Sequence, residues 1–219
     1  MFPLLSEDQA NPTELFQIWL NLPAVSKTAE PHFAMFWQAQ IPSQSFEDDA
    51  GRRTLVTSYA KPLPGGTSPP SPPPASWAAD PANGVGIWTI KLDAGARWTL
   101  PATDAACSRV VYVFAGDGVD LAGVAVDAGN GAALAPEAAV AIENDDAPAE
   151  LLLLEGKPIG DSFAPHGPFV MNDRAGLKQA FADYQRTGYG GWHWPEPGPV
   201  HGRDEGRFAA YPDGRVERP

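Results

Sequence analysis

The chain has 219 residues with 43% apolar residues, 22 glycines and 24 prolines, a composition that allows one large turn-rich domain with a proper core. Its formal charge of −12 repels phosphate backbones, and the apolar run Leu151–Leu154 is far shorter than the roughly 20 residues that cross a bilayer. We therefore expect no direct nucleic-acid binding, no membrane insertion and, since no signal-peptide pattern precedes residue 12, a cytoplasmic location.

The first strongly patterned segment is residues 15–22, where apolar Phe16, Ile18, Leu20 and Leu22 alternate with other residues. Period two over eight residues predicts a half-buried strand that ends at Pro23. Residues 24–41 are mixed and predict a loop with a helical turn. A second strand is expected at residues 53–60.

Residues 61–77 are rich in proline, which fixes φ and removes backbone donors, so they fit neither a helix nor a central strand. We interpret them as a stiff surface crossover between two strands. The alternative is a polyproline ligand for an SH3-like domain.

From Gly84 onward the pattern becomes regular. Short apolar segments are separated by turn sequences rich in Gly, Asp and Asn, which predicts a β-barrel or β-sandwich. The Gly-Asp-Gly of residues 116–118 is followed by no helix and is not a nucleotide-binding loop. The seven segments are residues 84–93, 96–100, 108–116, 119–126, 131–135, 138–144 and 149–156.

A helix is predicted over residues 173–186, capped by Asn172 or Asp173 and docked on the barrel by one apolar stripe. That stripe consists of Leu177, Ala180, Phe181 and Tyr184. Residues 189–219 are aperiodic and predict an extended tail, anchored by Trp192 and Trp194. Residues 165–172 join strand to helix, and we expect them to plug the barrel mouth or cover its edge; lining a ligand site is the alternative.

The sequence offers no pattern for a metal centre. Metal-binding barrels of this kind usually carry His-x-His, because alternate residues of a strand share a face. The four histidines are His32, His166, His193 and His201; none forms such a pair and none lies in the strands expected between 84 and 156.

Catalytic side chains are not indicated either. Glu143, Asp145 and Asp146 flank a turn and Asp48–Asp49 lie in a loop, both typical of solvated residues. Ser108 and the single cysteine, Cys107, have no nearby base, and we expect Cys107 to be a small buried side chain in a reducing compartment. We therefore assign no catalytic, cofactor-binding or metal-binding residue.

Two segments resemble the pirin family. Residues 14–33 resemble the connection between the two barrels of pirins, and residues 156–192, with PHGPFVMN and the following helix, resemble the pirin C-terminal signature. The resemblance implies a cupin fold, a double-stranded β-helix or jelly-roll barrel. It divides the chain into a remnant of the first cupin and connection (1–50), the C-terminal cupin barrel with its helix (51–188) and the tail (189–219).

The resemblance also implies iron in the first barrel, held by His-x-His and His-x-Glu, and links to quercetin 2,3-dioxygenase activity and protein partners. None of these ligands is found here, so no cofactor is expected in this chain. We expect a non-catalytic binding, structural or regulatory half. The alternative is part of an iron-dependent quercetin 2,3-dioxygenase whose metal barrel lies upstream of Met1.

Residues 15–22 also indicate how this chain associates with a partner. A strand with an uncovered apolar face pairs readily with another chain. We expect a protein partner or self-association through residues 15–22.

Overall fold

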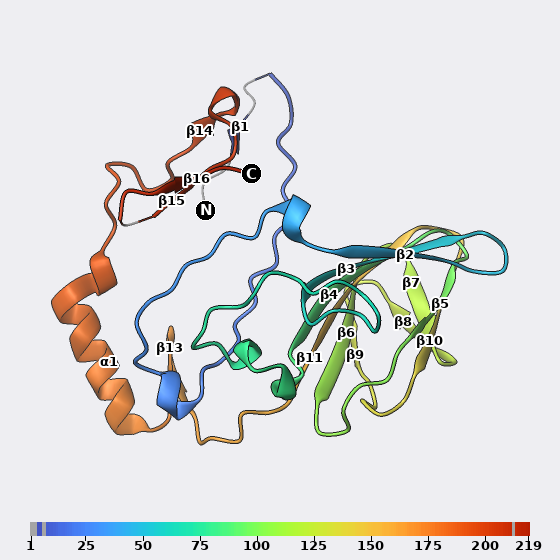
Figure 1. Ribbon diagram of the computed structural model, residues 1–219, viewed down its shortest axis with the longest axis horizontal. Helices are drawn as coiled ribbons and strands as arrows, with labels where there is room; N and C mark the ends of the chain where they lie inside the picture. The colour runs from blue at the N-terminus through green and yellow to red at the C-terminus, as the bar shows by residue number, and fades with distance from the viewer. Residues whose placement is uncertain (1–3, 6–7, 212) are drawn as a thin grey trace. The chain divides into compact units, whose positions relative to one another are not determined.

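The computed structural model describes residues 4–5, 8–211 and 213–219. Two compact units are present (Figure 1). The barrel unit comprises Phe36–Gly160, and the flanking unit comprises Met1–Met35 together with Asp161–Pro219. The division into residues 1–50, 51–188 and 189–219 stays a prediction.

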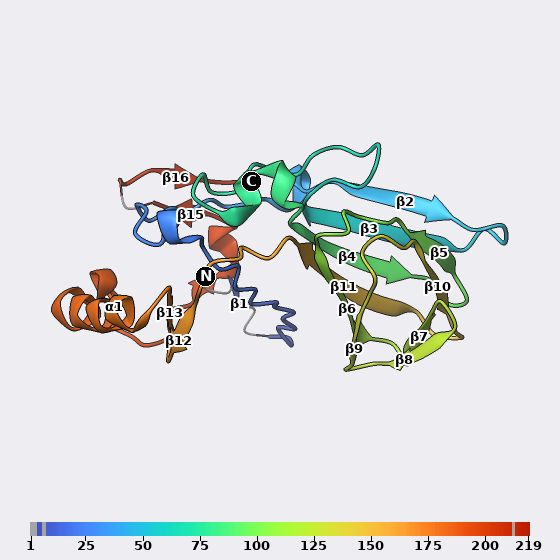
Figure 2. The same cartoon turned by 90° about the horizontal axis from the view of Figure 1, so that it is seen from below.

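The barrel unit consists of antiparallel strands in two sheets, which curve around a common interior (Figure 2). The larger sheet has the strand order β2-β3-β4-β11-β6-β9 and the smaller one β5-β10-β7-β8. The all-β barrel expected from the sequence is confirmed. The strands are β2 (Ser43–Glu47), β3 (Arg53–Ala60), β4 (Gly86–Leu92), β5 (Arg97–Leu100), β6 (Ser108–Ala115), β7 (Gly118–Leu121), β8 (Val124–Asp127), β9 (Gly131–Ala133), β10 (Val140–Asn144) and β11 (Ala149–Gly156).

Strand β11 lies at the centre of the larger sheet. Leu151 stands opposite Ile90 of β4 on one side and Val113 of β6 on the other, and Leu153 stands opposite Trp88 and Val111. Because the side-chain period of a strand is two, this register brings one apolar row from each strand to the same face. The interior is therefore filled by apolar side chains of both sheets, all of them buried.

One predicted segment proves to be two strands. Residues 119–126 turn back at Ala122 and Gly123, whose φ values are 53° and 88°, so that β7 pairs with β8. Two successive positive φ values are those of the tight turn that suits a two-residue hairpin. Alanine is uncommon in this conformation, so the turn at Ala122 and Gly123 has only a weak signal in the sequence.

The proline-rich crossover is confirmed. Residues 61–76 contain no helix or strand and connect β3 to β4, ending at a short 3-10 helix, Trp77–Ala79. Leu63 reaches into the barrel core from this crossover.

The flanking unit holds the one α-helix of the described chain, α1 (Arg174–Thr187), with Asp173 as its N-cap. The side chain of Asp173 accepts a hydrogen bond from the Gly176 amide at 2.7 Å, which confirms the predicted helix and one of its two candidate caps. The helix packs on a hairpin of β12 (Ala164–His166) and β13 (Phe169–Met171). Its docking on the barrel stays a prediction.

Short paired strands complete the flanking unit. Strand β1 (Leu4–Leu5) pairs in parallel with β14 (His201–Gly202), and β15 (Ala209–Ala210) pairs with β16 (Val216–Glu217). The tail is extended, as expected, but it also forms these brief pairings.

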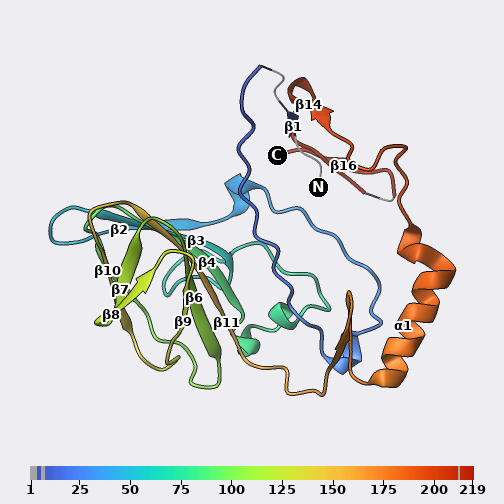
Figure 3. The same ribbon diagram turned by 180° about the vertical axis from the view of Figure 1, so that it is seen from behind.

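The strand predicted over residues 15–22 is wrong. Within the described chain these residues belong to no helix or strand, and Figure 3 shows them as part of a long coil, drawn in blue. Leu15 and Trp19 are 68% and 66% exposed. Alternation decides which way side chains point, but a strand also needs a neighbouring strand to take up its backbone hydrogen bonds.

Among the described residues, the structure has no helix of the length and apolarity that a bilayer crossing requires.

Candidate functional site in the barrel

The barrel interior is apolar at its centre and charged at one end. Along β11, Leu151, Leu153 and Glu155 are all buried and share the inward face. Leu151 and Leu153 belong to the apolar core, whereas the Glu155 side chain has no exposed surface. A carboxylate therefore ends a row of apolar side chains.

Two cations lie against this carboxylate. Lys61 Nζ is 2.5 Å from Glu155 Oε1, and Arg109 Nε is 3.1 Å from Oε2, close enough for an ion pair but not aligned as a hydrogen bond. The Arg109 side chain is fully buried and that of Lys61 is 30% exposed. Buried charges are tolerated only when they are paired, so these three side chains form one unit, which we call the ion cluster.

Neighbouring groups accept further hydrogen bonds from the two cations. Arg109 Nη2 donates to the Pro101 carbonyl at 2.6 Å, and Lys61 Nζ donates to Thr103 Oγ1 at 2.6 Å. The Trp88 indole donates to the Lys61 carbonyl at 2.7 Å and holds a backbone whose φ is 62°. A long side chain seldom adopts a positive φ, so packing around Lys61 holds it there.

The ion cluster also depends on the absence of a side chain at Gly86 of β4. A Cβ at this position would lie 2.8 Å from Glu155 Cγ, closer than carbon atoms approach. Glycine inside a strand often marks such a close approach. Gly86 therefore makes the space that the Glu155 side chain occupies.

Burial is the main influence on the charge of Arg109. It lowers the pKa of the guanidinium, and the nearby Glu155 carboxylate and Cys107 oppose it. Arginine remains charged throughout the physiological range even so. Two positive side chains thus face one negative side chain, and the ion cluster as a whole favours an anion over a cation.

A second ion pair lies close in sequence to the ion cluster. Lys157 Nζ is 2.6 Å from Asp104 Oδ2. The hydrogen bond between them lowers the pKa of Asp104 and raises that of Lys157. Because both side chains are substantially exposed, this pair is screened by solvent and contributes less than a buried one.

A polar groove of about 480 Å³ lies at the other end of β11. Arg97 and Glu143 pair across it at 3.1 Å, and Asn144 is buried beneath it with its amide donating to three backbone carbonyls. The groove is lined by Arg52, Gly95, Arg97, Asp120, Gly123, Glu143, Asn144, Asp145 and Asp146. Asp145 and Asp146 follow β10 in an exposed turn and Glu143 is an exposed residue near the end of β10, in keeping with the prediction that these three flank a turn, whereas Asp120 belongs to β7.

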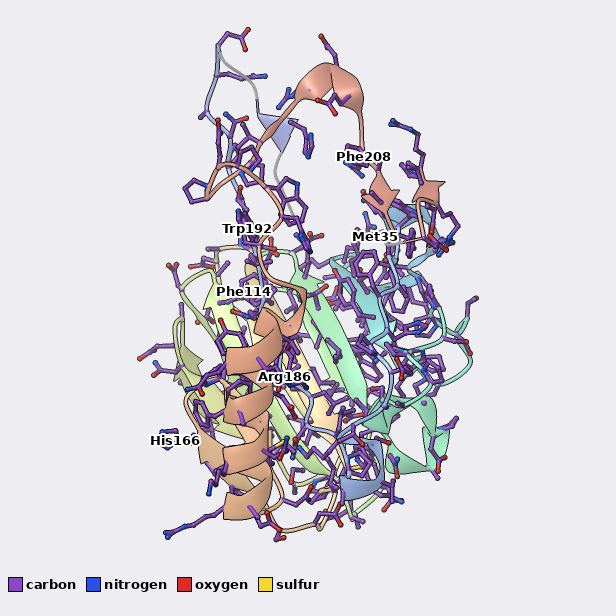
Figure 4. The ribbon with its side chains drawn as sticks, turned by 90° about the vertical axis from the view of Figure 1, so that its left-hand side faces the viewer. Met35, Phe114, His166, Arg186, Trp192 and Phe208 are labelled. Atoms are coloured by element: carbon purple, nitrogen blue, oxygen red, sulfur yellow. The ribbon has the colours of Figure 1, made fainter. Side chains whose placement is uncertain are left out.

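All four histidines lie in the flanking unit. His32 is in the N-terminal coil, His193 and His201 are in the tail, and His166, labelled in Figure 4, is in β12. The His166 ring stands edge-on to that of Phe181, with centroids 5.5 Å apart. His201 pairs with Glu205 at 3.3 Å. No strand of the barrel therefore carries a histidine.

The other residues discussed from the sequence have structural roles. Cys107 is buried, as predicted, against Gly84. Asp48 binds Arg52 and two backbone amides of its own loop, which lowers the pKa of its carboxyl. The segment 165–172 forms most of the β12–β13 hairpin, which the sequence analysis did not recognise.

The ion cluster itself was missed by sequence reasoning. The sequence did contain a signal for it. Alternate residues of a strand share a face, so Arg109 lies on the same face of β6 as the buried Val111 and Val113, and Glu155 lies on the same face of β11 as Leu153. A charged residue on the inward side of two adjacent strands predicts a buried pair. The third member, Lys61, comes from the proline-rich crossover and has no such signal.

The residues of this barrel do not suit an iron ion of the kind that the resemblance implies for the first barrel. Iron sites of this kind use imidazole and carboxylate ligands with free lone pairs. The barrel interior presents aliphatic side chains, and its Glu155 carboxylate is already engaged by two cations. Over residues 4–5, 8–211 and 213–219, no three His, Cys, Asp or Glu side chains come together as a metal site would require.

Comparison with known proteins links the chain to one family. Residues 87–190 match the model of the pirin C-terminal cupin domain. A pirin-like protein of Caulobacter vibrioides is 36% identical over 175 residues, which are 78% of this chain and 57% of that protein. A protein of Arabidopsis thaliana named "Putative pirin-like protein" is 30% identical over 212 residues, 87% of this chain and 67% of that protein.

Solved structures agree on the fold. The crystal structure of quercetin 2,3-dioxygenase from Acinetobacter baumannii superposes with a TM-score of 0.64 at 23% identity, over 78% of this chain and 55% of that one. The cupin fold predicted from the resemblance is confirmed. The chain spans between 55% and 62% of the length of three curated relatives that it matches.

Proposed function

Because the chain belongs to the pirin family, we propose that its cupin barrel is a binding or structural half that performs no catalysis by itself. The filled interior supports this proposal most directly. Apolar side chains fill the barrel interior, and the carboxylate at its charged end is engaged by Lys61 and Arg109. Such a barrel is suited to support or recruit another domain.

Association through the N-terminal coil is part of this proposal. Leu15, Trp19 and Phe33 are each more than half exposed, and a surface of this kind is usually covered by another protein surface. We propose that a second copy of the chain covers it. Light scattering at micromolar concentration should report a dimer, and the double variant Leu15→Ser, Trp19→Ser should be a monomer. A clean monomer of the unaltered chain contradicts self-association.

The alternative function is part of an iron-dependent quercetin 2,3-dioxygenase-type oxidoreductase whose metal-bearing barrel lies upstream of Met1. It is favoured by the name of the Acinetobacter baumannii protein and by the share of that protein, 55%, that this chain covers. In this alternative the ion cluster would stabilise the second barrel and the chemistry would occur elsewhere.

Iron content and quercetin turnover test whether this chain performs catalysis by itself. The 219-residue chain is incubated anaerobically with Fe²⁺, desalted, and assayed for iron per chain and for loss of quercetin absorbance under oxygen, with the Acinetobacter baumannii enzyme as positive control. We expect no retained iron and no turnover. Stoichiometric iron with turnover would overturn the non-catalytic proposal. A variant with all four histidines replaced by alanine would then show whether they hold the iron.

A further inference from the structure

Three aromatic rings meet where α1 ends. Phe169 comes from β13, Tyr184 from the last turn of α1 and Tyr189 from the 3-10 turn Gly188–Gly190. The ring centroid of Phe169 lies 6.0 Å from that of each tyrosine, and the two tyrosine ring centroids are 5.6 Å apart. The rings are steeply inclined to one another, at 64°, 89° and 63°.

These separations suit a cation held by three ring faces. A cation about 4 Å from each of three mutually perpendicular rings requires centroids about 6 Å apart, and cation–π contacts extend to about 6 Å from a ring centroid. Phe181 packs against Phe169, with centroids 4.8 Å apart and the two rings inclined at 82°.

Tyr189 is held in an unfavourable conformation although its ring remains exposed. Its φ and ψ are 47° and 45°, a left-handed conformation that is a genuine outlier for a bulky side chain. The Thr187 hydroxyl accepts from its amide at 3.0 Å, and its own hydroxyl donates to the Ala180 carbonyl at 3.1 Å. Yet Tyr184 and Tyr189 are 52% and 59% exposed. The strained turn therefore positions a ring in solvent rather than in a core.

The electrostatic surroundings favour a positive ligand. The C-terminal end of a helix carries a partial negative charge, and both tyrosines stand at that end of α1. The cation of the last helical turn, Arg186, labelled on α1 in Figure 4, is paired with Asp183 at 2.9 Å. The chain as a whole carries a formal charge of −12.

We propose that Phe169, Tyr184 and Tyr189 form an aromatic cage for a methylated ammonium group. Quaternary and methylated ammonium ions carry a diffuse charge with a thin hydration shell, and aromatic cages recognise them for that reason. The group is supplied either by a small molecule such as choline or by a methylated lysine side chain of a peptide. This site is separate from the barrel and does not depend on the function proposed for it.

Proton NMR titration of the full chain with choline tests the cage. The neutral isostere 3,3-dimethyl-1-butanol has the same shape without the charge and is the matched ligand control. We expect saturable ring-current shifts of the choline N-methyl signal, and binding of the isostere at least tenfold weaker. Equal binding of the two ligands, or no saturable shift up to about 10 mM choline, overturns the proposal.

Three variants locate the binding. Tyr189→Gly removes the ring and introduces glycine, which adopts a φ of 47° without strain. The thermal stability of this variant should therefore hold or rise, while its affinity for choline falls at least tenfold. Tyr184→Leu should lose affinity to a similar extent. Tyr59→Leu, an exposed tyrosine on β3, should bind as the unaltered chain does. Unchanged affinity in Tyr189→Gly contradicts the cage.

A pair of peptides identifies the source of the ammonium group. One contains trimethyllysine and the other the unmodified lysine in the same sequence. Tighter binding of the trimethyllysine peptide than of choline supports the cage as a peptide reader, and tighter binding of choline supports it as a small-molecule site. Equal binding of the two peptides overturns the proposal, because the lysine ammonium has the charge without the methyl groups.

Discussion

The two units of the chain use their apolar residues differently. In the barrel unit, apolar side chains from both sheets meet in one buried cluster. In the described part of the flanking unit, Ala180 and Ala209 are the buried apolar residues, while Trp19, Tyr184 and Tyr189 stand more than half exposed. The barrel therefore holds most of the stability, and the flanking unit offers the surfaces suited to binding. The predictions below test this division, from the largest expected effect to the smallest.

Removing the carboxylate of the ion cluster should destabilise the barrel most. Glu155→Ala leaves the buried Arg109 and the partly exposed Lys61 without a counter-charge, which costs about 3–5 kcal/mol. Urea unfolding followed by tryptophan fluorescence measures it. The matched control is Glu143→Ala, whose pair with Arg97 is exposed and worth about 1 kcal/mol at most. Similar effects of the two variants would contradict a buried ion cluster.

Truncating a core side chain should also show that the two units contribute differently to stability. Leu153→Ala removes a fully buried side chain at the centre of the barrel and should cost about 2–5 kcal/mol of unfolding free energy. Val25→Ala, at a residue that is 92% exposed in the flanking unit, should change stability by less than about 0.5 kcal/mol. Chemical denaturation of both variants checks this. A comparable loss in Val25→Ala would show that the flanking unit contributes to the core.

The cap of α1 should have a smaller and local effect. Asp173→Ala removes the acceptor for the Gly176 amide and should destabilise the helix by about 1 kcal/mol. Hydrogen exchange should accelerate in residues 174–187 and stay unchanged in β11. Uniform acceleration in both elements would mean that the two units unfold together.

The exposed pair Lys157–Asp104 should give the smallest effect. The pKa of Asp104 is lowered from 3.8 in the folded chain, chiefly by its hydrogen bond from Lys157, so the unfolded chain binds the proton more tightly. The pair stabilises the fold above the ordinary carboxyl range and is lost as the pH falls through the lowered pKa.

Asp104→Asn tests this pH dependence. Its stability difference from the unaltered chain should be present at pH 6, decrease progressively as the pH falls below 3.8, and shrink in 1 M salt at pH 6 because an exposed pair is screened. A difference that does not change with pH or with salt would show that Asp104 acts through packing rather than charge.

The sequence predicted the barrel better than the flanking unit for a physical reason. Strand β3 was predicted at residues 53–60, as observed, because alternating side chains of a barrel strand face a core on one side and solvent on the other. Residues 15–22 show the same alternation but lie in a coil, since a strand requires a neighbour that local sequence does not specify. Alternation therefore predicts a strand correctly only where a neighbouring strand is available to pair with it.

The sites were predictable only in part. The inward parity of Arg109 and Glu155 could have indicated a buried pair, but Lys61 joins them across 94 residues from a proline-rich crossover. The aromatic cage depends on the positive φ of Tyr189, which a tyrosine does not signal. Both sites are made by contacts between distant segments or by an uncommon backbone conformation.

The central claim is that the barrel interior is a filled scaffold rather than a metal centre. Its most direct test is a Mn²⁺ titration of methyl-labelled protein, because the paramagnetic ion broadens signals of nearby methyl groups. The account predicts that the methyl signals of Val111, Leu151 and Leu153 remain sharp at one equivalent of Mn²⁺. Saturable broadening of these three signals at one equivalent would place a metal inside the barrel and contradict the account.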